Sequence, residues 1–287
     1  MKRIGIILAM IRFEHTVFAL PFAVMSAFLA AGGLPEWGTL GWIVGAMVGA
    51  RSCAMAFNRL ADAKIDAANP RTQKRALPAG LIGVRSVQLF TAASAAWFIF
   101  CAWRLNPLAF ALSPLALAVV MFYSYSKRFT SLSHAWLGVS LSIAPVGAWI
   151  AVLGRFDLLP LALALAVALW VAGFDIIYSC QDVHFDKTHG LYSVPSRAGI
   201  RRALLLSRIL HALMMIVLLS VPRLASGHGV DLGWAYWGGC AAVGGLLVYE
   251  HSLVKPDDLS RVNAAFFTMN GLVSLALMSV CSLDVVW

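Results

Sequence analysis

Charged residues are scarce in this sequence. Lys, Arg, Asp and Glu make up 12% of its 287 residues, whereas soluble domains carry about 25%. Hydrophobic residues make up 61%, and the mean hydropathy is +0.82. A water-soluble chain of this length could not bury so much apolar surface. We therefore exclude a soluble globular protein and predict a polytopic protein whose surroundings are the lipid bilayer.

The sequence also lacks cysteine pairs with metal-ligand spacing. Its five cysteines are scattered through apolar segments, and we interpret them as small packing residues. No low-complexity linker divides the chain, which favours a single domain over residues 1–287. The net charge of +9 is explained by basic loops on one side of a membrane, and we expect no nucleic-acid partner.

Apolar stretches long enough to cross a membrane recur along the whole chain. A spanning helix needs about 20 such residues, and Pro or Gly marks several of the ends. The predicted fold class is therefore all-α and integral to the membrane. We predict nine spanning helices, at residues 12–33, 38–58, 86–104, 107–124, 134–153, 158–178, 203–222, 232–250 and 262–282.

Successive predicted helices place the loops between them alternately on the two sides of the membrane. Lys and Arg residues are distributed unevenly between these two sides. All but four of the 22 lie near the N-terminus or around the loops that follow the second, fourth, sixth and eighth helices. Arg104, Arg155 and Arg223 lie on the other side, and Arg51 lies within a helix. Because basic residues mark cytoplasmic loops, we predict a cytoplasmic N-terminus and an external C-terminus. We expect the apolar N-terminal stretch, which has no small-residue cleavage site, to stay in the mature chain.

The loop after the second predicted helix carries an oxygen-rich pattern. Asn58, Asp62 and Asp66 are spaced by four, so on a helix they share one face. The helix should end before Pro70, and the basic residues Arg71, Lys74 and Arg75 follow at once. Carboxylates beside cations suit Mg²⁺ and phosphate together, although one such pattern also fits an ordinary polar loop.

A second acidic pattern lies at the end of the sixth predicted helix. Asp175, Asp182 and Asp186 are spaced by seven and four, again on one helical face and on the same side of the membrane. Carboxylates at helix ends near lipid are costly unless they are paired or bound to metal. Two such groups therefore favour a shared metal site over a structural coincidence.

Three other positions carry charge or a hydroxyl near these patterns. Arg51 lies two helical turns before Asn58, and an intramembrane arginine should face a cavity, as a substrate-binding residue or as an ion-pair partner. Tyr123 and Lys127 share a face, and with Arg128 they also fit the ordinary role of interfacial anchors. We assign no role to the seven histidines or to Glu14.

These residues together resemble the UbiA superfamily of membrane prenyltransferases. The resemblance rests on Asn58-x-x-x-Asp62-x-x-x-Asp66 and Asp182-x-x-x-Asp186 in a frame of nine helices. The string NPRTQKRALPAG is similar to another segment of that family, except that Ala76 stands where the family usually has proline. Tyr123-x-x-x-Lys127 matches a further motif. The match spans nearly the whole chain.

The resemblance implies a horseshoe of nine helices around a central cavity that a cytoplasmic cap covers. It implies that Mg²⁺ and diphosphate are held by Asn58, Asp62, Asp66, Asp182 and Asp186. Lys127, with Arg71 or Arg75, would bind diphosphate oxygens, and Asp175 would begin the second motif region. The catalytic group would then comprise the four paired aspartates and Lys127, while Arg51, Tyr123 and Arg128 would belong to the substrate site, Arg128 toward an aromatic carboxylate.

The resemblance further implies transfer of a polyprenyl group from a prenyl diphosphate to an aromatic acid in ubiquinone or menaquinone biosynthesis. It implies that the enzyme lies in the bacterial inner membrane, with its site on the cytoplasmic side. The acceptor stays open between 4-hydroxybenzoate and a dihydroxynaphthoate of the futalosine route. A membrane transporter is the main alternative class, but it would need acidic residues near the bilayer midplane. The D-x-x-D-G signature of CDP-alcohol phosphotransferases is absent from the sequence.

Overall fold

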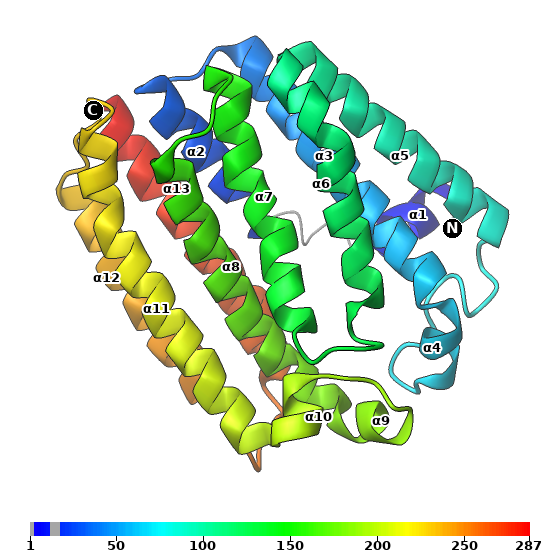
Figure 1. The fold of residues 1–287 in the computed structure, drawn as a ribbon. Helices are drawn as coiled ribbons and strands as arrows, with labels where there is room; N and C mark the ends of the chain where they lie inside the picture. Colours follow the sequence, from blue (N-terminus) through cyan, green and yellow to red (C-terminus); the bar gives the residue numbers. More distant parts are fainter. Residues whose placement is uncertain (1–2, 12–17) are drawn as a thin grey trace.

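The computed structural model describes residues 3–11 and 18–287, and the regular elements in this part of the chain are helices (Figure 1). The α-helices are α1 (Arg3–Ile11), α2 (Leu20–Ala31), α3 (Trp37–Ala61), α4 (Ala63–Ala68), α5 (Val84–Leu105), α6 (Pro107–Ser126), α7 (Ser133–Leu153), α8 (Leu158–Ser179), α9 (Val183–Thr188), α10 (Val194–Ala198), α11 (Ile200–Ser226), α12 (Trp234–Ser252) and α13 (Asn270–Val286). A 3₁₀ turn, η2 (Cys180–Asp182), follows α8, and a π-helix, η3 (Ala264–Met269), precedes α13.

Local residues explain where several helices begin and end. Asn106 caps α6, because its side chain accepts a hydrogen bond from the Ala109 amide at 2.9 Å, and Pro107 occupies the first helical position. Gly154 ends α7 with a φ of 65°, a left-handed conformation that favours glycine. Asp157 then accepts a hydrogen bond from the Leu158 amide at the start of α8.

The apolar helices are long enough to cross a membrane in most of the predicted places. Within the described residues, seven helical segments have the length and composition of a span: Trp37–Ala61, Val84–Leu105, Pro107–Ser126, Ser133–Leu153, Leu158–Thr188, Ile200–Ser226 and Ala264–Val286. Large side chains such as Leu89, Leu115 and Ile216 remain exposed on them, as expected of surfaces that face lipid. The protein is a multi-pass membrane protein.

Two of the nine predicted spans differ from this set. The described part of the first is α2, which has 12 residues, and residues 12–17, with Glu14 and His15, lie outside the described part of the chain. The eighth forms α12, a 19-residue helix that contains two Gly-Gly pairs, Glu250 and His251 and is less apolar than the seven. The count of nine therefore stays a prediction, as does the predicted cytoplasmic cap.

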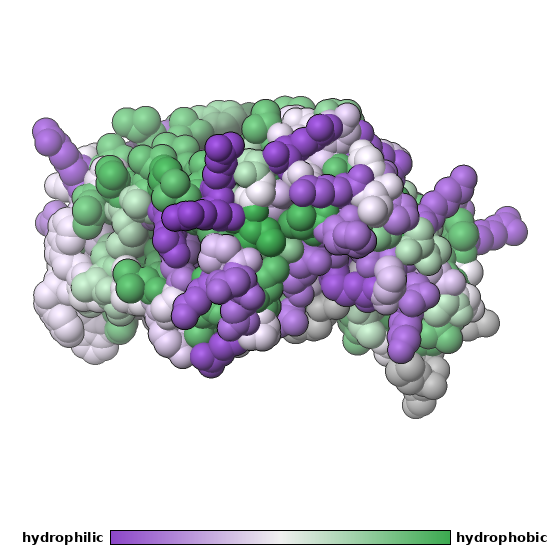
Figure 2. Space-filling view, turned by 90° about the horizontal axis from the view of Figure 1, so that it is seen from below, coloured by the Kyte–Doolittle hydropathy of each residue, from purple (hydrophilic) through white to green (hydrophobic). Residues whose placement is uncertain are grey.

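The core lies between α2, α7, α8, α11, α12 and α13. Trp149, Trp170, Tyr236 and Phe22 are among its largest fully buried side chains. The short helices α4, α9 and α10 gather at one end of the long helices, and the C-terminus lies at the other end (Figure 1). Seen from the end with the short helices, the surface gathers many hydrophilic side chains (Figure 2). Both acidic patterns lie at this polar end.

Candidate functional site

Asn58, Asp62 and Asp66 lie where α3 gives way to α4. Asp62 breaks the helix with a φ of −93° and a ψ of 6°, in a sparsely occupied region where active-site residues recur. Helical hydrogen bonding continues across the break, since the Asp62 amide donates to the Asn58 carbonyl and the Asp66 amide donates to the Asp62 carbonyl. The Asn58 side-chain amide also donates to Asp62 Oδ2 at 3.0 Å. The spacing of four therefore keeps these residues together despite the break.

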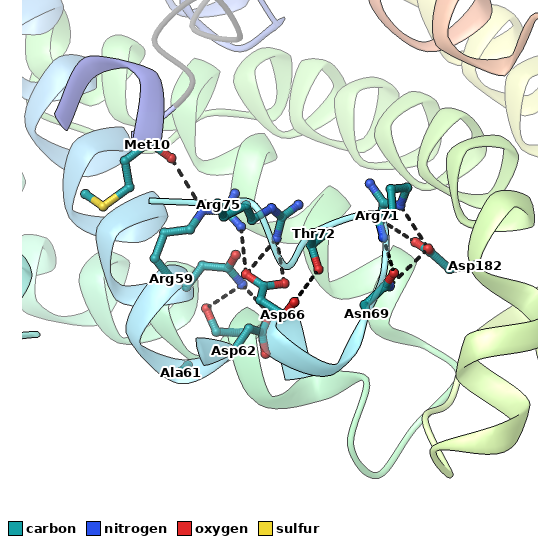
Figure 3. A network of polar contacts seen from close by, with 12 residues as sticks. Met10, Arg59, Ala61, Asp62, Asp66, Asn69, Arg71, Thr72, Arg75 and Asp182 are labelled. Carbon is teal, nitrogen blue, oxygen red and sulfur yellow. Dashed lines mark hydrogen bonds and ion pairs between the residues drawn. The ribbon is translucent and has the colours of Figure 1, made fainter. Parts of the chain in front are cut away.

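Basic side chains surround these two carboxylates (Figure 3). Arg75 Nη1 lies 2.7 Å from Asp66 Oδ1 and 2.8 Å from Oδ2, and Arg59 Nη1 lies 3.4 Å from Oδ2. Lys127 Nζ lies 3.8 Å from Asp62 Oδ2. Asp62 and Asp66 are both buried, so these cations offset the cost of placing two negative charges inside the protein.

Arg71 joins the loop after α4 to the second acidic group. Its Nε and Nη2 donate to Asp182 at 3.0 and 2.5 Å, although the two residues are 111 positions apart in the sequence (Figure 3). Asn69 Nδ2 lies 3.4 Å from the same carboxylate. Burial lowers the pKa of Arg71, but the hydrogen bond and charge of Asp182 outweigh it and raise the pKa above its ordinary value. Arg71 is therefore a permanent cation between the two acidic groups.

Asp175 and Asp186 have other partners. His134 Nδ1 lies 2.7 Å from Asp175 Oδ2, and the Val194 amide donates to His134 Nε2 at 3.3 Å, which links α7, α8 and α10. The Ser193 hydroxyl donates to Asp186 Oδ2 at 2.8 Å. Ser193 also forms the capping box of α10, so this carboxylate is tied to the start of a helix.

All five carboxylates open into one pocket of about 240 Å³. The predicted site residues that line it are Arg51, Asn58, Asp62, Asp66, Arg71, Arg75, Tyr123, Lys127, Asp175, Asp182 and Asp186. Residues from the two distant acidic patterns thus face one space, while their roles in binding and catalysis stay a prediction.

Arg128 is the exception. Its Nη2 donates to the Ala61 carbonyl at 2.5 Å and to Asp62 Oδ1 at 3.2 Å, and its guanidinium lies 4.9 Å from the centroid of the Tyr125 ring. It does not belong to the described residues that line the pocket. In this arrangement Arg128 neutralises Asp62, and its contact with a substrate carboxylate stays a prediction.

A second, apolar cavity of about 390 Å³ adjoins the polar pocket. It lies between α3, α5, α6 and α7, and its wall includes small residues such as Ala50, Ala116 and Gly147. Leu115 on α6 and Phe156 on the loop after α7 also line it, and both are exposed at the surface. The residues that line both spaces are Arg51, Met55, Asn58, Tyr123, Leu137 and Leu141.

Several pocket residues were not predicted from the sequence. His134, Asn69 and Tyr178 contact predicted residues that are 41, 113 and 107 positions away in the sequence. Ser193 is only seven positions from its partner Asp186, but it lies beyond the end of α9, so the two residues do not share a helix. Of these four, only Asn69 could have been suspected from the sequence, because it lies next to the first motif and directly before Pro70. Aromatic side chains also line the pocket: Phe18, Phe174, Phe185, Tyr192 and Phe266.

The pocket has the donor chemistry that Mg²⁺ requires. Hard oxygen ligands from carboxylates and amides, completed by substrate phosphate and water, are its usual surroundings. Among the described residues no three acidic, histidine or cysteine side chains converge as a ready ion site, because arginine and lysine pair with Asp62, Asp66 and Asp182. The residues fit a metal that arrives together with an anionic substrate. The substrate would then pair with the arginine and lysine side chains and free the carboxylates for the metal.

The fold and the pocket define a helical membrane protein with an acidic and basic pocket beside an apolar cavity. Residues 19–272 match the UbiA prenyltransferase family. The chain is 30% identical to the 4-hydroxybenzoate octaprenyltransferase of Aliivibrio fischeri strain MJ11, over 87% of this chain and 86% of that protein. It therefore belongs to the UbiA prenyltransferase family and is an enzyme of that class.

Solved structures share the fold. The apo structure of a UbiA homolog from Aeropyrum pernix K1 superposes with a TM-score of 0.80 at 31% identity and covers 94% of this chain and 96% of that one. A UbiA homolog from Archaeoglobus fulgidus, solved with GPP and Mg²⁺, gives a TM-score of 0.77 at 20% identity, over 98% of this chain and 99% of that one.

Proposed function

We propose that this chain transfers a polyprenyl group from a prenyl diphosphate to an aromatic acid of the 4-hydroxybenzoate type, with Mg²⁺, in quinone biosynthesis. One observation carries the proposal: two acidic groups from distant segments share a basic pocket that adjoins an apolar cavity. A diphosphate suits the first space and a polyprenyl tail suits the second.

The diphosphate would lie among Arg71, Arg75 and Lys127. Each of these cations holds a carboxylate, and each is at least partly exposed to the pocket. A UbiA homolog from Archaeoglobus fulgidus was solved with GPP and Mg²⁺. Asn58, Asp62, Asp66, Asp182 and Asp186 would hold the metal, since they supply the hard oxygen ligands that Mg²⁺ prefers. Bound there, Mg²⁺ would supply positive charge to the departing diphosphate oxygens.

The reaction then follows from the chemistry of an allylic diphosphate. The bond between carbon and oxygen breaks with both electrons on the diphosphate, which Arg71, Arg75 and Lys127 stabilise. The electron-rich ring attacks the remaining allylic cation through carbon, and the ring carbon then loses its proton. Prenylated acid, diphosphate and a proton are the products. The apolar cavity keeps water away from the cation.

The acceptor is assigned from the relatives, whose names specify 4-hydroxybenzoate. Arg51, which lines both spaces beside Tyr123, suits the acceptor carboxylate, and Arg128 would join it after releasing Asp62. A dihydroxynaphthoate has the same carboxylate and phenolic ring and is the alternative acceptor. We place the enzyme in the bacterial inner membrane, with the pocket toward the cytoplasm, where water-soluble aromatic acids are available.

The test is transfer by the purified protein in detergent or lipid. Wild-type protein, Mg²⁺ and a long-chain prenyl diphosphate are incubated with 4-hydroxybenzoate or with a dihydroxynaphthoate. We expect diphosphate release and a prenylated ring with one acid, loss of both with EDTA, and recovery on adding excess Mg²⁺. Absence of product with every phenolic acid tried would refute the proposal.

A further inference from the structure

Aromatic rings form the deep wall of the polar pocket. This aromatic wall consists of Phe18, Phe174, Tyr178 and Phe266, which come from three distant parts of the chain and all line the pocket. The Tyr178 and Phe266 centroids are 4.2 Å apart, with ring planes inclined by 33°. Phe266 also meets Phe174 at 5.2 Å and Phe18 at 5.6 Å, both edge to face.

The aromatic wall lies directly below the second acidic group. Tyr178 precedes Asp182 by one helical turn, roughly 6 Å along the axis, and Phe174 lies a turn deeper. Arg71 connects the two levels, because it holds Asp182 and its Nη1 donates to the Tyr178 hydroxyl at 3.2 Å. Its guanidinium also lies 5.5 Å from the centroid of the Tyr178 ring. This ring therefore already faces one cation in the structure.

A π-helix places Phe266 in this wall. η3 is a rare, wide helical turn of the kind that recurs at functional sites. The fully buried Asn270 holds it, since Asn270 Nδ2 lies 3.0 Å from the Ala265 carbonyl and 3.1 Å from the Phe266 carbonyl. Asn270 is itself fixed by Trp170 Nε1 at 2.6 Å and Glu250 Oε1 at 2.9 Å.

We infer that Tyr178 and Phe266 stabilise the allylic cation and that Asn270 is the positioning residue that sets the place of Phe266. The inference rests on the proposed prenyl transfer. When the donor loses its diphosphate among Arg71, Arg75 and Lys127, positive charge develops on the first carbons of the tail, one layer deeper. The faces of aromatic rings attract cations, and rings, unlike water, do not add to them.

The test compares two neighbouring phenylalanines. Phe266→Leu and Phe266→Met remove the ring from the wall, whereas Phe266→Tyr keeps it. Phe267→Leu is the matched control, because Phe267 belongs to the same π-helix but does not line the pocket in the described part of the chain. We expect kcat to fall about tenfold in the first two variants, which is about 1.4 kcal/mol in the barrier, with the donor KM within about twofold. Phe266→Tyr and Phe267→Leu should stay near wild type.

A second readout separates cation stabilisation from packing. The ratio of free prenyl alcohol to prenylated acid should rise in Phe266→Leu and in Asn270→Ala, each checked for folding by its melting temperature. If Asn270→Ala does not fold, the Phe266 variants decide alone. An unchanged kcat in Phe266→Leu and Phe266→Met, or an equal loss in Phe267→Leu, overturns the inference while wild-type transfer upholds the proposed function. Inactive wild-type protein overturns both.

Discussion

Asp66 and Asp182 lie in one pocket but in different surroundings. The Asp66 side chain is 5% exposed and its partner Arg59 is 6% exposed, whereas Asp182 and Arg71 are 20% and 33% exposed. A buried ion pair that loses one member leaves a charge without compensation, whereas water screens a partly exposed pair. The two carboxylates should therefore contribute differently to stability.

Substitution by asparagine separates these contributions. We expect Asp66→Asn to lower the free energy of unfolding by about 3 kcal/mol, because Arg59 and Arg75 then lose their counter-charge. Asp182→Asn should cost less than about 1 kcal/mol. Both should lower turnover more than about 100-fold, because each removes a proposed metal ligand.

Thermal unfolding and single-turnover prenyl transfer measure the two effects on the same samples. Asp257→Asn is the control, since Asp257 is an exposed aspartate on the loop after α12 and outside the pocket lining. If Asp182→Asn keeps a near-normal rate, the assignment of the second acidic group is wrong.

The sequence could predict the residues whose partners lie one turn away along the same helical stretch. Asn58 and Asp62 are four apart and do hydrogen-bond. It could not predict the contact of His134 with Asp175, because 41 positions separate them and only the packing of α7 on α8 brings them together. The same holds for Arg71 and Asp182: both residues were predicted to belong to the site, but the ion pair between them was not predicted.

At the scale of elements, close helix packing sets the distance between site residues. α7 and α8 approach at Gly138, where an added Cβ would lie 2.3 Å from the Ala168 carbonyl oxygen. α8 and α11 approach at Gly173, where a Cβ would lie 2.3 Å from His211 Nε2. Glycine at both positions lets α8, which carries Asp175, sit tightly between its neighbours.

A single methyl group at Gly138 should therefore disturb both stability and the site. We expect Gly138→Ala to cost about 1–3 kcal/mol, because a backbone carbonyl cannot rotate away as a flexible side chain can. Separation of the helices should also lengthen the contact between His134 and Asp175 and lower turnover. Melting temperature and kcat check this. Gly245→Ala on α12, where a Cβ meets nothing within 4 Å, should leave both unchanged.

The helices themselves were largely predictable, but their irregularities were not. Apolar stretches predicted α3, α5, α6, α7, α8 and α11 within a few residues, since length and hydropathy alone determine a span. The break at Asp62, the 3₁₀ turn at Cys180–Asp182 and the π-helix at Ala264–Met269 leave no such pattern. These departures depend on tertiary partners such as Asn270.

At the scale of the whole molecule, whether α12 crosses the membrane determines on which side the C-terminus lies. Its 19 residues span about 28 Å, close to the roughly 30 Å of a bilayer core. Side chains of α13 tie both of its ends: Asp284 accepts hydrogen bonds from the Gly233 and Tyr236 amides at 2.9 and 2.7 Å, and Asn270 donates to Glu250. α12 and α13 are thus antiparallel over almost their full length, so α12 should cross wherever α13 crosses.

Reporter fusions test the orientation that this pairing implies. With α12 as a span, the loop at 253–263, which contains Lys255 and Arg261, lies on the same side as the pocket, and the C-terminus lies on the opposite side. We expect alkaline phosphatase fused after Trp287 to be active and a fluorescent protein there to be dark, with the reverse result for fusions after Asp257. Equal signals from the two junctions would mean that α13 does not cross. A pattern with both results inverted would place the pocket outside the cell, away from soluble aromatic acids, and would contradict the proposed location.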